Sequence, residues 1–275
     1  MKKLFTPLND RSIIKIEGND GAEFLQGLVT NDIDPSNKNL TYCLMQSPKG
    51  RFLYDFFVFF AENAIFLDVL AARSEEIIKK LNFFKLRKDV KISKLDDLSV
   101  FFCLDDHIVN SNIKIFDDPR ISGFGKRCYL EKSDIDPDLI DKSNLYDLNR
   151  ILLKIPESEK DLFYDKSIAV EFGLDNFNAI SFEKGCYVGQ ELTARTHHLG
   201  QVRKKVLLGK ILDFTKPNKG DKVLLEGNEI GVALSSEVKE NEIFCLMLIK
   251  TVEDDFILRF KNSLTVNGSK IELIK

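Results

Sequence analysis

Cys186 is the residue of this sequence that is best placed to do chemistry. It follows Lys184 and Gly185, and a glycine lets the backbone turn sharply at that point. The apolar run Ile180–Phe182 is typical of a strand, whereas Gln190–Arg195 favours a helix. The change of period therefore predicts a strand-to-helix turn that carries the cysteine.

The surroundings of this thiol would favour its reactive form. We expect the helix to begin at Tyr187, so that the positive end of the helix dipole and the Lys184 cation both favour the thiolate. The thiolate is the nucleophilic and metal-binding form of cysteine. Cys186 is therefore a candidate functional thiol. The alternative is a small buried cysteine at a helix start, since free cysteine is among the most buried residue types.

Two carboxylates lie within apolar segments and are further candidates. Asp55 falls inside the expected strand Phe52–Phe60, where burial would raise its pKa and make it an acid. The alternative is an inward carboxylate paired with an arginine. Glu171 lies in the strand-like run Ile168–Phe172 and could reach into a cavity; the alternative is an exposed strand residue.

Basic residues follow the Cys186 segment, at Arg195, His197, His198 and Arg203–Lys205. Such a run is either a solvated face or a basic rim for an anionic partner. The two histidines are adjacent, and adjacent residues of a strand point to opposite faces, so they are not expected to bind one metal together.

The five cysteines show no C-x-x-C spacing and are an odd number, which argues against a disulfide framework or a zinc site of the chain's own. A reducing compartment is expected. An iron–sulfur cluster needs about four thiolate or imidazole ligands. A [2Fe–2S] cluster with Cys186 as a ligand would therefore have to be shared across a dimer or with a partner. Four cysteines are interpreted as structural: Cys43, Cys103 and Cys245 in apolar strands, and Cys128 in a polar middle loop.

The elements that must position these residues change in character along the 275 residues. The first part alternates hairpins and helices, which indicates an α+β fold. Strands are expected over Ser12–Glu17, Leu40–Gln46, Phe52–Phe60, Ala64–Leu70, Val90–Ile92 and Leu98–Leu104, with helices from Asn19, from Ser74 and over Leu145–Leu153. From about residue 105 to 145 we expect loops with short strands. After Val202, short strands and turn signals such as Asn267-Gly268 predict a small antiparallel barrel.

The composition excludes several classes of protein. The 40 Lys and Arg nearly balance the 43 Asp and Glu, so the chain is not expected to bind nucleic acid directly by charge. The longest apolar runs fall far short of the ~20 residues that cross a bilayer, so no membrane partner is expected. The start of the sequence has neither a signal-peptide core nor the arginine-rich, acid-poor composition of a transit peptide.

The segment Lys184–Glu191, with the string K-G-C-Y-V-G-Q-E, resembles the signature of the YgfZ family of folate-binding proteins that assist iron–sulfur cluster assembly and repair. Other parts of the chain resemble the same family in the expected order. They are Phe24–Gly27 with Thr30–Asp32, Ser47–Asp55, Leu86-Arg87, Asp118–Arg120, Arg150-Ile151, Ile155–Glu157, Glu171 with Leu174-Asp175, and Ala194-Arg195. The resemblance is weaker after residue 205.

The resemblance implies the fold of the T-protein of the glycine cleavage system, three domains arranged as a ring around a folate site. We expect residues 1–200 to form the T-protein-like folate-binding region, as two intertwined α+β subdomains, and residues 201–275 to form the barrel. The ligand would be tetrahydrofolate or another reduced folate. Its candidate binding residues are Glu171, Lys184, Gly185, Tyr187, Gln190 and Arg195.

The resemblance also implies that the chain acts as an accessory protein more than as an enzyme with a reaction of its own. The chain would work with iron–sulfur assembly proteins and client enzymes, supporting maturation of [4Fe–4S] enzymes such as radical-SAM enzymes that modify tRNA. Its compartment would be the bacterial cytoplasm, or the mitochondrial matrix in a eukaryote.

The alternative function is that of a tetrahydrofolate-dependent aminomethyltransferase. Two departures from the T-protein disfavour it. Leu152 stands where the T-protein has a pterin-binding glutamate, and Asp55 is a single acid where the T-protein has two in sequence.

Overall fold

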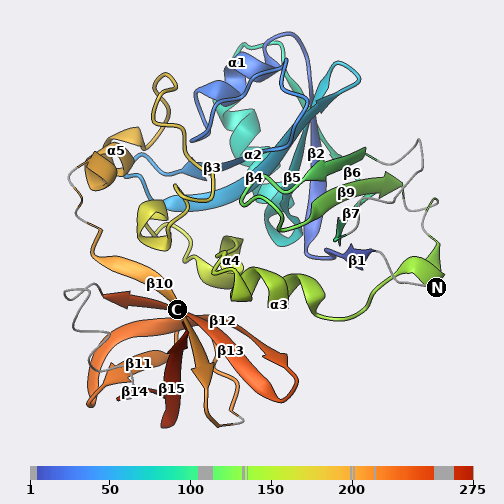
Figure 1. Cartoon of the computed structure of the whole chain (residues 1–275). Helices are drawn as coiled ribbons and strands as arrows, with labels where there is room; N and C mark the ends of the chain where they lie inside the picture. Colours follow the sequence, from blue (N-terminus) through green and yellow to red (C-terminus); the bar gives the residue numbers. More distant parts are fainter. Residues whose placement is uncertain are drawn as a thin grey trace. The chain divides into compact units, whose positions relative to one another are not determined.

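The computed structural model describes residues 5–104, 114–131, 134, 136–198, 200, 202–213, 215–250 and 263–274. The chain forms two compact units (Figure 1). Unit 1 comprises Met1–Ser143 and Asp175–Gln190, and unit 2 comprises Asn144–Leu174 and Glu191–Lys275. The domain boundary expected near residue 200 stays a prediction.

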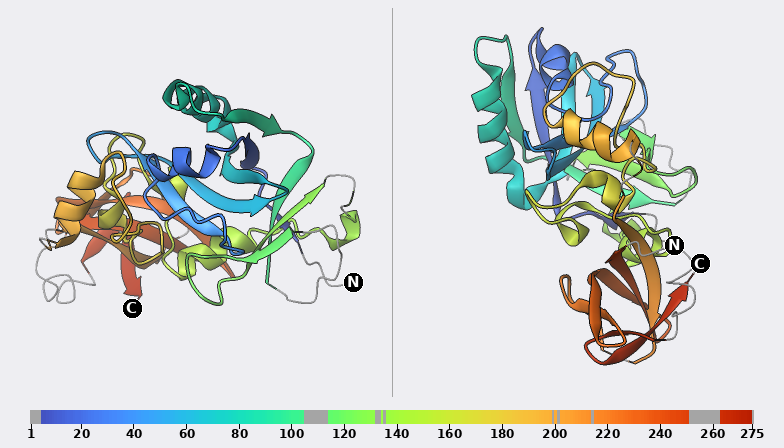
Figure 2. Two further views of the ribbon diagram at one scale, coloured as in Figure 1. Left: turned by 90° about the horizontal axis from the view of Figure 1, so that it is seen from above. Right: turned by 90° about the vertical axis from the view of Figure 1, so that its left-hand side faces the viewer.

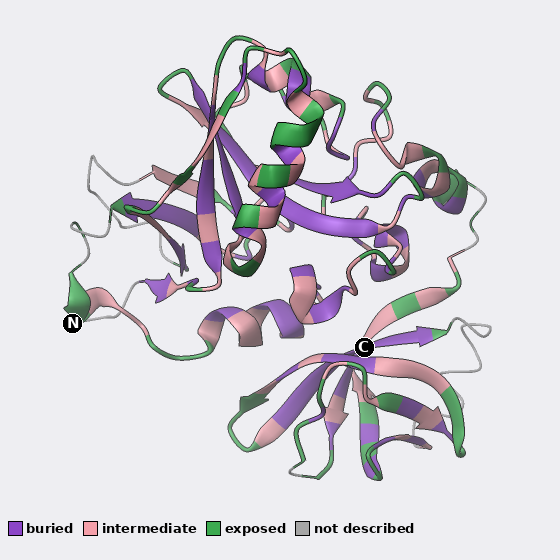
Figure 3. Ribbon diagram, turned by 180° about the vertical axis from the view of Figure 1, so that it is seen from behind, coloured by how far each residue is buried: buried purple, intermediate pink, exposed green. Residues whose placement is uncertain are grey.

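Unit 1 is built on a five-stranded antiparallel sheet with the strand order β3-β4-β5-β2-β6. Its strands are β2 (Arg11–Glu17), β3 (Thr41–Gln46), β4 (Phe52–Ala61), β5 (Ala64–Leu70) and β6 (Lys91–Leu95). The eight residues from Phe52 to Phe59 are all buried, so both faces of β4 are covered (Figure 3). Phenylalanine-rich strands of this kind exclude water from both faces, and β4 therefore contributes a large part of the core of unit 1.

A second sheet and two helices complete unit 1. The four-stranded sheet has the order β1-β7-β9-β8, with β1 (Thr6–Pro7), β7 (Leu98–Cys103), β8 (Lys114–Asp117) and β9 (Lys126–Glu131). The helices are α1 (Gly21–Gln26) and α2 (Ser74–Lys85), and short 3₁₀ turns lie at η1 (Ala71–Arg73) and η3 (Pro137–Leu139). Helix α2 buries Ile77 and Leu81 and packs against β2 and β6.

Unit 2 contains a closed antiparallel barrel with the order β10-β13-β12-β11-β14-β15, which Figure 2 shows from two sides. Its strands are β10 (Lys204–Ile211), β11 (Lys222–Leu225), β12 (Asn228–Lys239), β13 (Glu242–Lys250), β14 (Leu264–Val266) and β15 (Ser269–Ile274). The helical elements are α3 (Leu145–Leu152), α4 (Ser158–Asp161), η4 (Ala169–Phe172) and α5 (Gln190–His198). The barrel and the hairpin at Asn267-Gly268 were predicted from the sequence and are confirmed.

Four local predictions are wrong. Ile180–Phe182 is not a strand, and the helix after Cys186 begins at Gln190 and not at Tyr187. Glu171 lies in the 3₁₀ turn η4 and not in a strand. Cys128 lies within β9 and is buried, whereas we expected it in a polar loop.

Among the described residues, no helix combines the length and the apolar character needed to cross a membrane.

Candidate functional site

The loop that carries Cys186 is fixed by the side chain of Lys184. The Lys184 Nζ donates hydrogen bonds of 2.8, 2.8 and 2.7 Å to the backbone carbonyls of Gln26, Val29 and Asn31. These carbonyls belong to the end of α1 and the segment after it (Figure 1). Partial burial lowers the pKa of Lys184. Its ammonium group therefore acts as a clamp between two distant parts of the chain.

Backbone hydrogen bonds and one threonine strengthen this attachment. The Ser181 amide donates to the Thr30 carbonyl at 3.0 Å, and the Val188 amide donates to the Gly27 carbonyl at 3.3 Å. The buried Thr30 hydroxyl donates to the Ala179 carbonyl at 2.6 Å. Sequence reasoning did not assign Thr30 a role, although its segment carries part of the family resemblance. The structure thus brings that segment and the Cys186 loop together in unit 1.

Gly189 is the glycine that the loop requires. Its φ of 87° suits the third residue of the turn that the Gln190 amide closes on the Tyr187 carbonyl at 3.3 Å. A Cβ atom at Gly189 would lie 2.6 Å from the Ser47 carbonyl oxygen. Gly185, to which we assigned the sharp turn, has no positive φ, and a Cβ there would meet no atom within 4 Å. That assignment is wrong.

Cys186 is exposed, whereas the other four cysteines are buried. Burial raises the pKa of the Cys245 thiol to about 12 and that of Cys43 above its usual range. The pKa of the Cys128 thiol is raised by its hydrogen bond with Cys103, 3.0 Å away, and by burial. The alternative of a buried structural cysteine therefore does not hold for Cys186.

The expected cause of thiolate formation at Cys186 is not in place. The helix α5 begins four residues later, at Gln190, and the Lys184 ammonium group is bound to three carbonyls. What the structure provides is access: Gly185 and Cys186 are exposed at the tip of a loop that is anchored at both ends.

The neighbouring candidates have different environments. Tyr187 is buried, with its ring centre 5.5 Å from the Lys184 Nζ. Gln190 is the first residue of α5 and is partly buried. Arg195 lies on α5 in an exposed ion pair with Glu191 at 2.7 Å, the kind of contact that contributes little to stability. The exposed pairing of Arg195 with Glu191 agrees with a solvated face, one of the two interpretations of this basic run.

Asp55 takes part in a buried ion-pair network. Arg11 lies 3.2 Å from an Asp55 oxygen and 2.6 Å from Asp68. Arg127 connects Asp68, at 2.7 Å, to Asp118, at 3.2 Å, and the network ends in an ion pair of 2.8 Å between Asp118 and Arg120. All six side chains are fully buried: Arg11, Asp55, Asp68, Asp118, Arg120 and Arg127. This arrangement matches the alternative of an inward carboxylate paired with an arginine.

Glu171 lies in unit 2, where η4 packs against β10. Its side chain is only 11% exposed, and one carboxylate oxygen lies 3.7 Å from the Lys204 Nζ. Leu152, which the resemblance aligns with the T-protein's glutamate, is the last residue of α3. The carboxylate of Glu171 is of the type that can accept hydrogen bonds from a pterin amino group.

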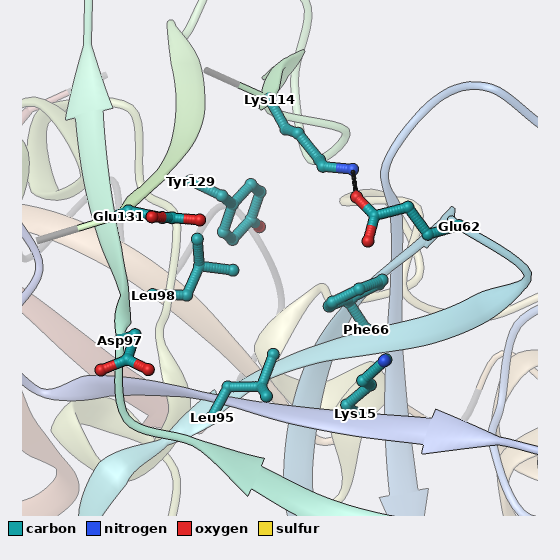
Figure 4. A pocket seen from close by; sticks show the side chains of 9 residues that line it. All are labelled: Lys15, Glu62, Phe66, Leu95, Asp97, Leu98, Lys114, Tyr129 and Glu131. Carbon is teal, nitrogen blue, oxygen red and sulfur yellow. Dashed lines mark hydrogen bonds and ion pairs between the residues drawn. The ribbon is translucent and has the colours of Figure 1, made fainter. Parts of the chain in front are cut away.

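Within the described ranges there is no group of three or more His, Cys, Asp or Glu side chains arranged to hold a metal ion. Unit 1 has a cavity of about 610 Å³ next to Phe66 and Tyr129, where Lys114 pairs with Glu62 at 2.9 Å (Figure 4). The residues that line this cavity include none of the candidate site residues predicted from the sequence.

The fold is that of an aminomethyltransferase. The crystal structure of the glycine cleavage system aminomethyltransferase T from Bartonella henselae is similar to this chain, with a TM-score of 0.75 over 99% of this chain and 85% of that chain. The sequences are 13% identical, so the similarity shows the fold alone. The predicted α+β fold of the T-protein type, with a C-terminal antiparallel barrel, is confirmed.

Several curated proteins that are similar in sequence are iron–sulfur cluster assembly factors. The chain is 32% identical over 230 residues to the mitochondrial iron–sulfur cluster assembly factor IBA57 homolog of Neurospora crassa, and these residues span 74% of the chain and 52% of that protein. The Pyricularia oryzae homolog is 31% identical over 221 residues, spanning 74% of the chain and 56% of that protein. Human mitochondrial IBA57 is 29% identical over 236 residues, spanning 75% and 66%.

The chain thus spans about half to two thirds of the length of these relatives. No protein-family model matches the sequence.

Proposed function

We propose that this chain is an iron–sulfur cluster assembly factor of the IBA57 and YgfZ type, in which Cys186 is the functional thiol. The observation that carries the proposal is the exposure of this one cysteine on a loop that Lys184 clamps to unit 1. The similarity to IBA57 proteins supports the same role. The relatives are described as mitochondrial, which supports the mitochondrial option and not the bacterial cytoplasm that we expected first.

The cluster would be cargo that is handed between proteins. A single exposed thiolate is a soft ligand for iron and fits a cluster whose other ligands come from an assembly protein or a client enzyme. Burial removes the other four thiols from such contacts. The clients would be [4Fe–4S] enzymes, among them radical-SAM enzymes that modify tRNA.

A reduced folate is the ligand proposed for the same protein. Glu171 would accept hydrogen bonds from the pterin, in place of the glutamate that Leu152 replaces. The Lys204 ammonium group lies 3.7 Å from one oxygen of the Glu171 carboxylate. The aminomethyltransferase alternative rests on the fold alone, and the buried pairing of Asp55 gives no support to an acid at that position.

The proposal is tested by anaerobic purification with a candidate assembly protein carrying a [2Fe–2S] cluster. We expect the visible spectrum of the cluster to change when the wild-type chain is added, and to stay unchanged with Cys186→Ser. Glu183→Gln is the matched control, because Glu183 is an exposed neighbour on the same loop. Equal spectra with both variants would exclude Cys186 as a ligand.

Folate binding needs a separate experiment. We expect Glu171→Ala to weaken tetrahydrofolate binding at least tenfold in calorimetry, because a hydrogen bond to a charged group contributes about 1.5–3 kcal/mol. Unchanged affinity would remove Glu171 from the site. A wild-type chain without measurable binding would remove folate from the proposal and leave the role of Cys186 intact.

A further inference from the structure

The end of helix α2 concentrates positive charge. Residues 79–88, called the α2 tip below, contain no acidic residue, whereas the chain as a whole has a formal charge of −3. The five cations of the α2 tip are Lys79, Lys80, Lys85, Arg87 and Lys88. The acids nearby are Asp20, Glu23 and Asp89, which directly follows the tip, and Glu23 pairs with Lys88 at 2.7 Å. Five cations against three acids give this region a net positive charge in a chain of slightly negative charge.

Large apolar side chains are exposed among these cations. Phe83 is 75% exposed, Phe84 is 36% exposed and Leu86 is 84% exposed. The buried stripe of the helix is formed by other residues, Ile77 and Leu81. Figure 3 shows the exposed turns of α2 in green. Three exposed apolar residues within four positions form a patch, and patches of this kind mark interaction surfaces.

Leu86 is also held in a conformation that favours glycine. Its φ and ψ are 50° and −110°, and the Lys88 amide donates to the Lys85 carbonyl at 2.9 Å. These values belong to the first central residue of a type II′ turn, where glycine is preferred. A bulky residue at positive φ is unusual and costs free energy. Because this leucine is exposed, burial in the chain's own core does not offset the strain.

We propose that the α2 tip binds the surface of a bilayer that contains anionic phospholipids. Phe83 and Leu86 enter the interface between headgroups and acyl chains, and the cations lie against the lipid phosphates. A hollow of about 690 Å³ beside the tip is lined by Phe84, Leu86 and the cations Lys85, Arg87 and Lys88, with Asp20, and can receive a headgroup.

A lipid surface fits this composition better than an acidic protein does. Four of the five cations are lysines, and the buried centre of protein interfaces is depleted in lysine. A lipid phosphate needs only a point charge, which an ammonium group supplies. The expectation that the chain has no membrane partner rested on the lack of a spanning segment, and binding to a surface needs no such segment.

The absence of tryptophan from the sequence permits a direct test. Phe83→Trp introduces a single fluorophore at a position that is 75% exposed, so the fold should not change. With vesicles of phosphatidylcholine and 30% phosphatidylglycerol, we expect a blue shift of the emission and quenching by brominated acyl chains. We expect neither with pure phosphatidylcholine, and 0.5 M NaCl should reverse the shift.

Vesicle co-sedimentation of further variants separates the contribution of the exposed apolar side chains from that of the cations. Leu86→Gly suits the turn and should keep the fold while it lowers the partition coefficient about tenfold. The double variant Lys79→Gln, Arg87→Gln should lower it at least tenfold. Leu212→Ser changes an exposed leucine elsewhere and should have no effect. If the wild type binds both kinds of vesicle equally, or binds neither, the proposal is wrong and an acidic protein partner becomes the better account.

Discussion

The Lys184 ammonium group donates a hydrogen bond of 2.8 Å to the Val29 carbonyl, across 155 residues of sequence. With its bonds to Gln26 and Asn31, this contact makes Lys184 a positioning residue for the Cys186 loop. The three carbonyls take up the donors of the ammonium group, because lysine has three. Lys184 therefore serves to hold the loop more than to bind an anion.

Replacement of Lys184 by methionine should release the loop. Removal of the ammonium group leaves three carbonyls without this donor, and we expect the free energy of unfolding to fall by about 2–4 kcal/mol. Hydrogen exchange should become faster at the amides of Ser181 and Val188, which bind the carbonyls of Thr30 and Gly27.

Lys49→Met is the control for this variant, because Lys49 is an exposed lysine in the turn between β3 and β4. Equal exchange at Ser181 in both variants would contradict the clamp.

The two glycines of the loop should respond differently to alanine. Gly189→Ala places a Cβ atom 2.6 Å from the Ser47 carbonyl oxygen at a φ of 87°. We therefore expect the free energy of unfolding, measured in urea, to fall by about 1–3 kcal/mol or more. Gly185→Ala meets no atom within 4 Å and should change stability by less than about 0.5 kcal/mol. The reverse order of the two effects would show that the turn is at Gly185.

Acid should destabilise unit 1 through Asp118. Burial acts to raise the pKa of this carboxyl, but Arg120 and Arg127 outweigh burial and hold the pKa below its usual value. A depressed folded-state pKa stabilises the folded chain above about pH 4, and this contribution is lost as the pH falls through the folded pKa.

Urea unfolding between pH 3 and 7 measures this effect. Asp118→Asn should lower stability at pH 7 by about 3–5 kcal/mol and reduce the loss on acidification, because it removes a titrating member of a buried network. An unchanged pH dependence in the variant would mean that other carboxyls control acid unfolding.

The five cysteines should differ sharply in their rate of alkylation. Cys186 is exposed, whereas burial raises the pKa of Cys43 and Cys245, and the Cys103 contact and burial raise that of Cys128. We expect limited iodoacetamide at neutral pH to modify Cys186 first, with the peptide masses read by mass spectrometry. Comparable modification of Cys43 or Cys245 in the folded chain would contradict the described burial.

Local patterns predicted much of the fold. The strand Ala64–Leu70 and the hairpin at Asn267-Gly268 lie where the sequence placed them, because alternation and turn chemistry are local properties. The helix expected from Asn19 is the short α1, which begins at Gly21.

The site was less predictable because its geometry depends on distant contacts. The clamp of Lys184 needs the end of α1, and the pairing of Asp55 needs Arg11 on another strand. The apolar run Ile180–Phe182 belongs to a loop held by hydrogen bonds and not to the predicted strand. The need for a glycine at position 189 likewise depends on its close approach to Ser47. The spacing of residues within the loop does not reveal this contact.

The most direct test of the central claim is complementation in cells that lack their own IBA57 or YgfZ protein. The activity of a [4Fe–4S] enzyme is measured in extracts, with the amount of each variant checked on blots. We predict that the wild-type chain and Glu183→Gln restore activity, whereas Cys186→Ser is present at the same level and restores little or none. Full restoration by Cys186→Ser would contradict the account and leave the exposed thiol without a part in cluster assembly.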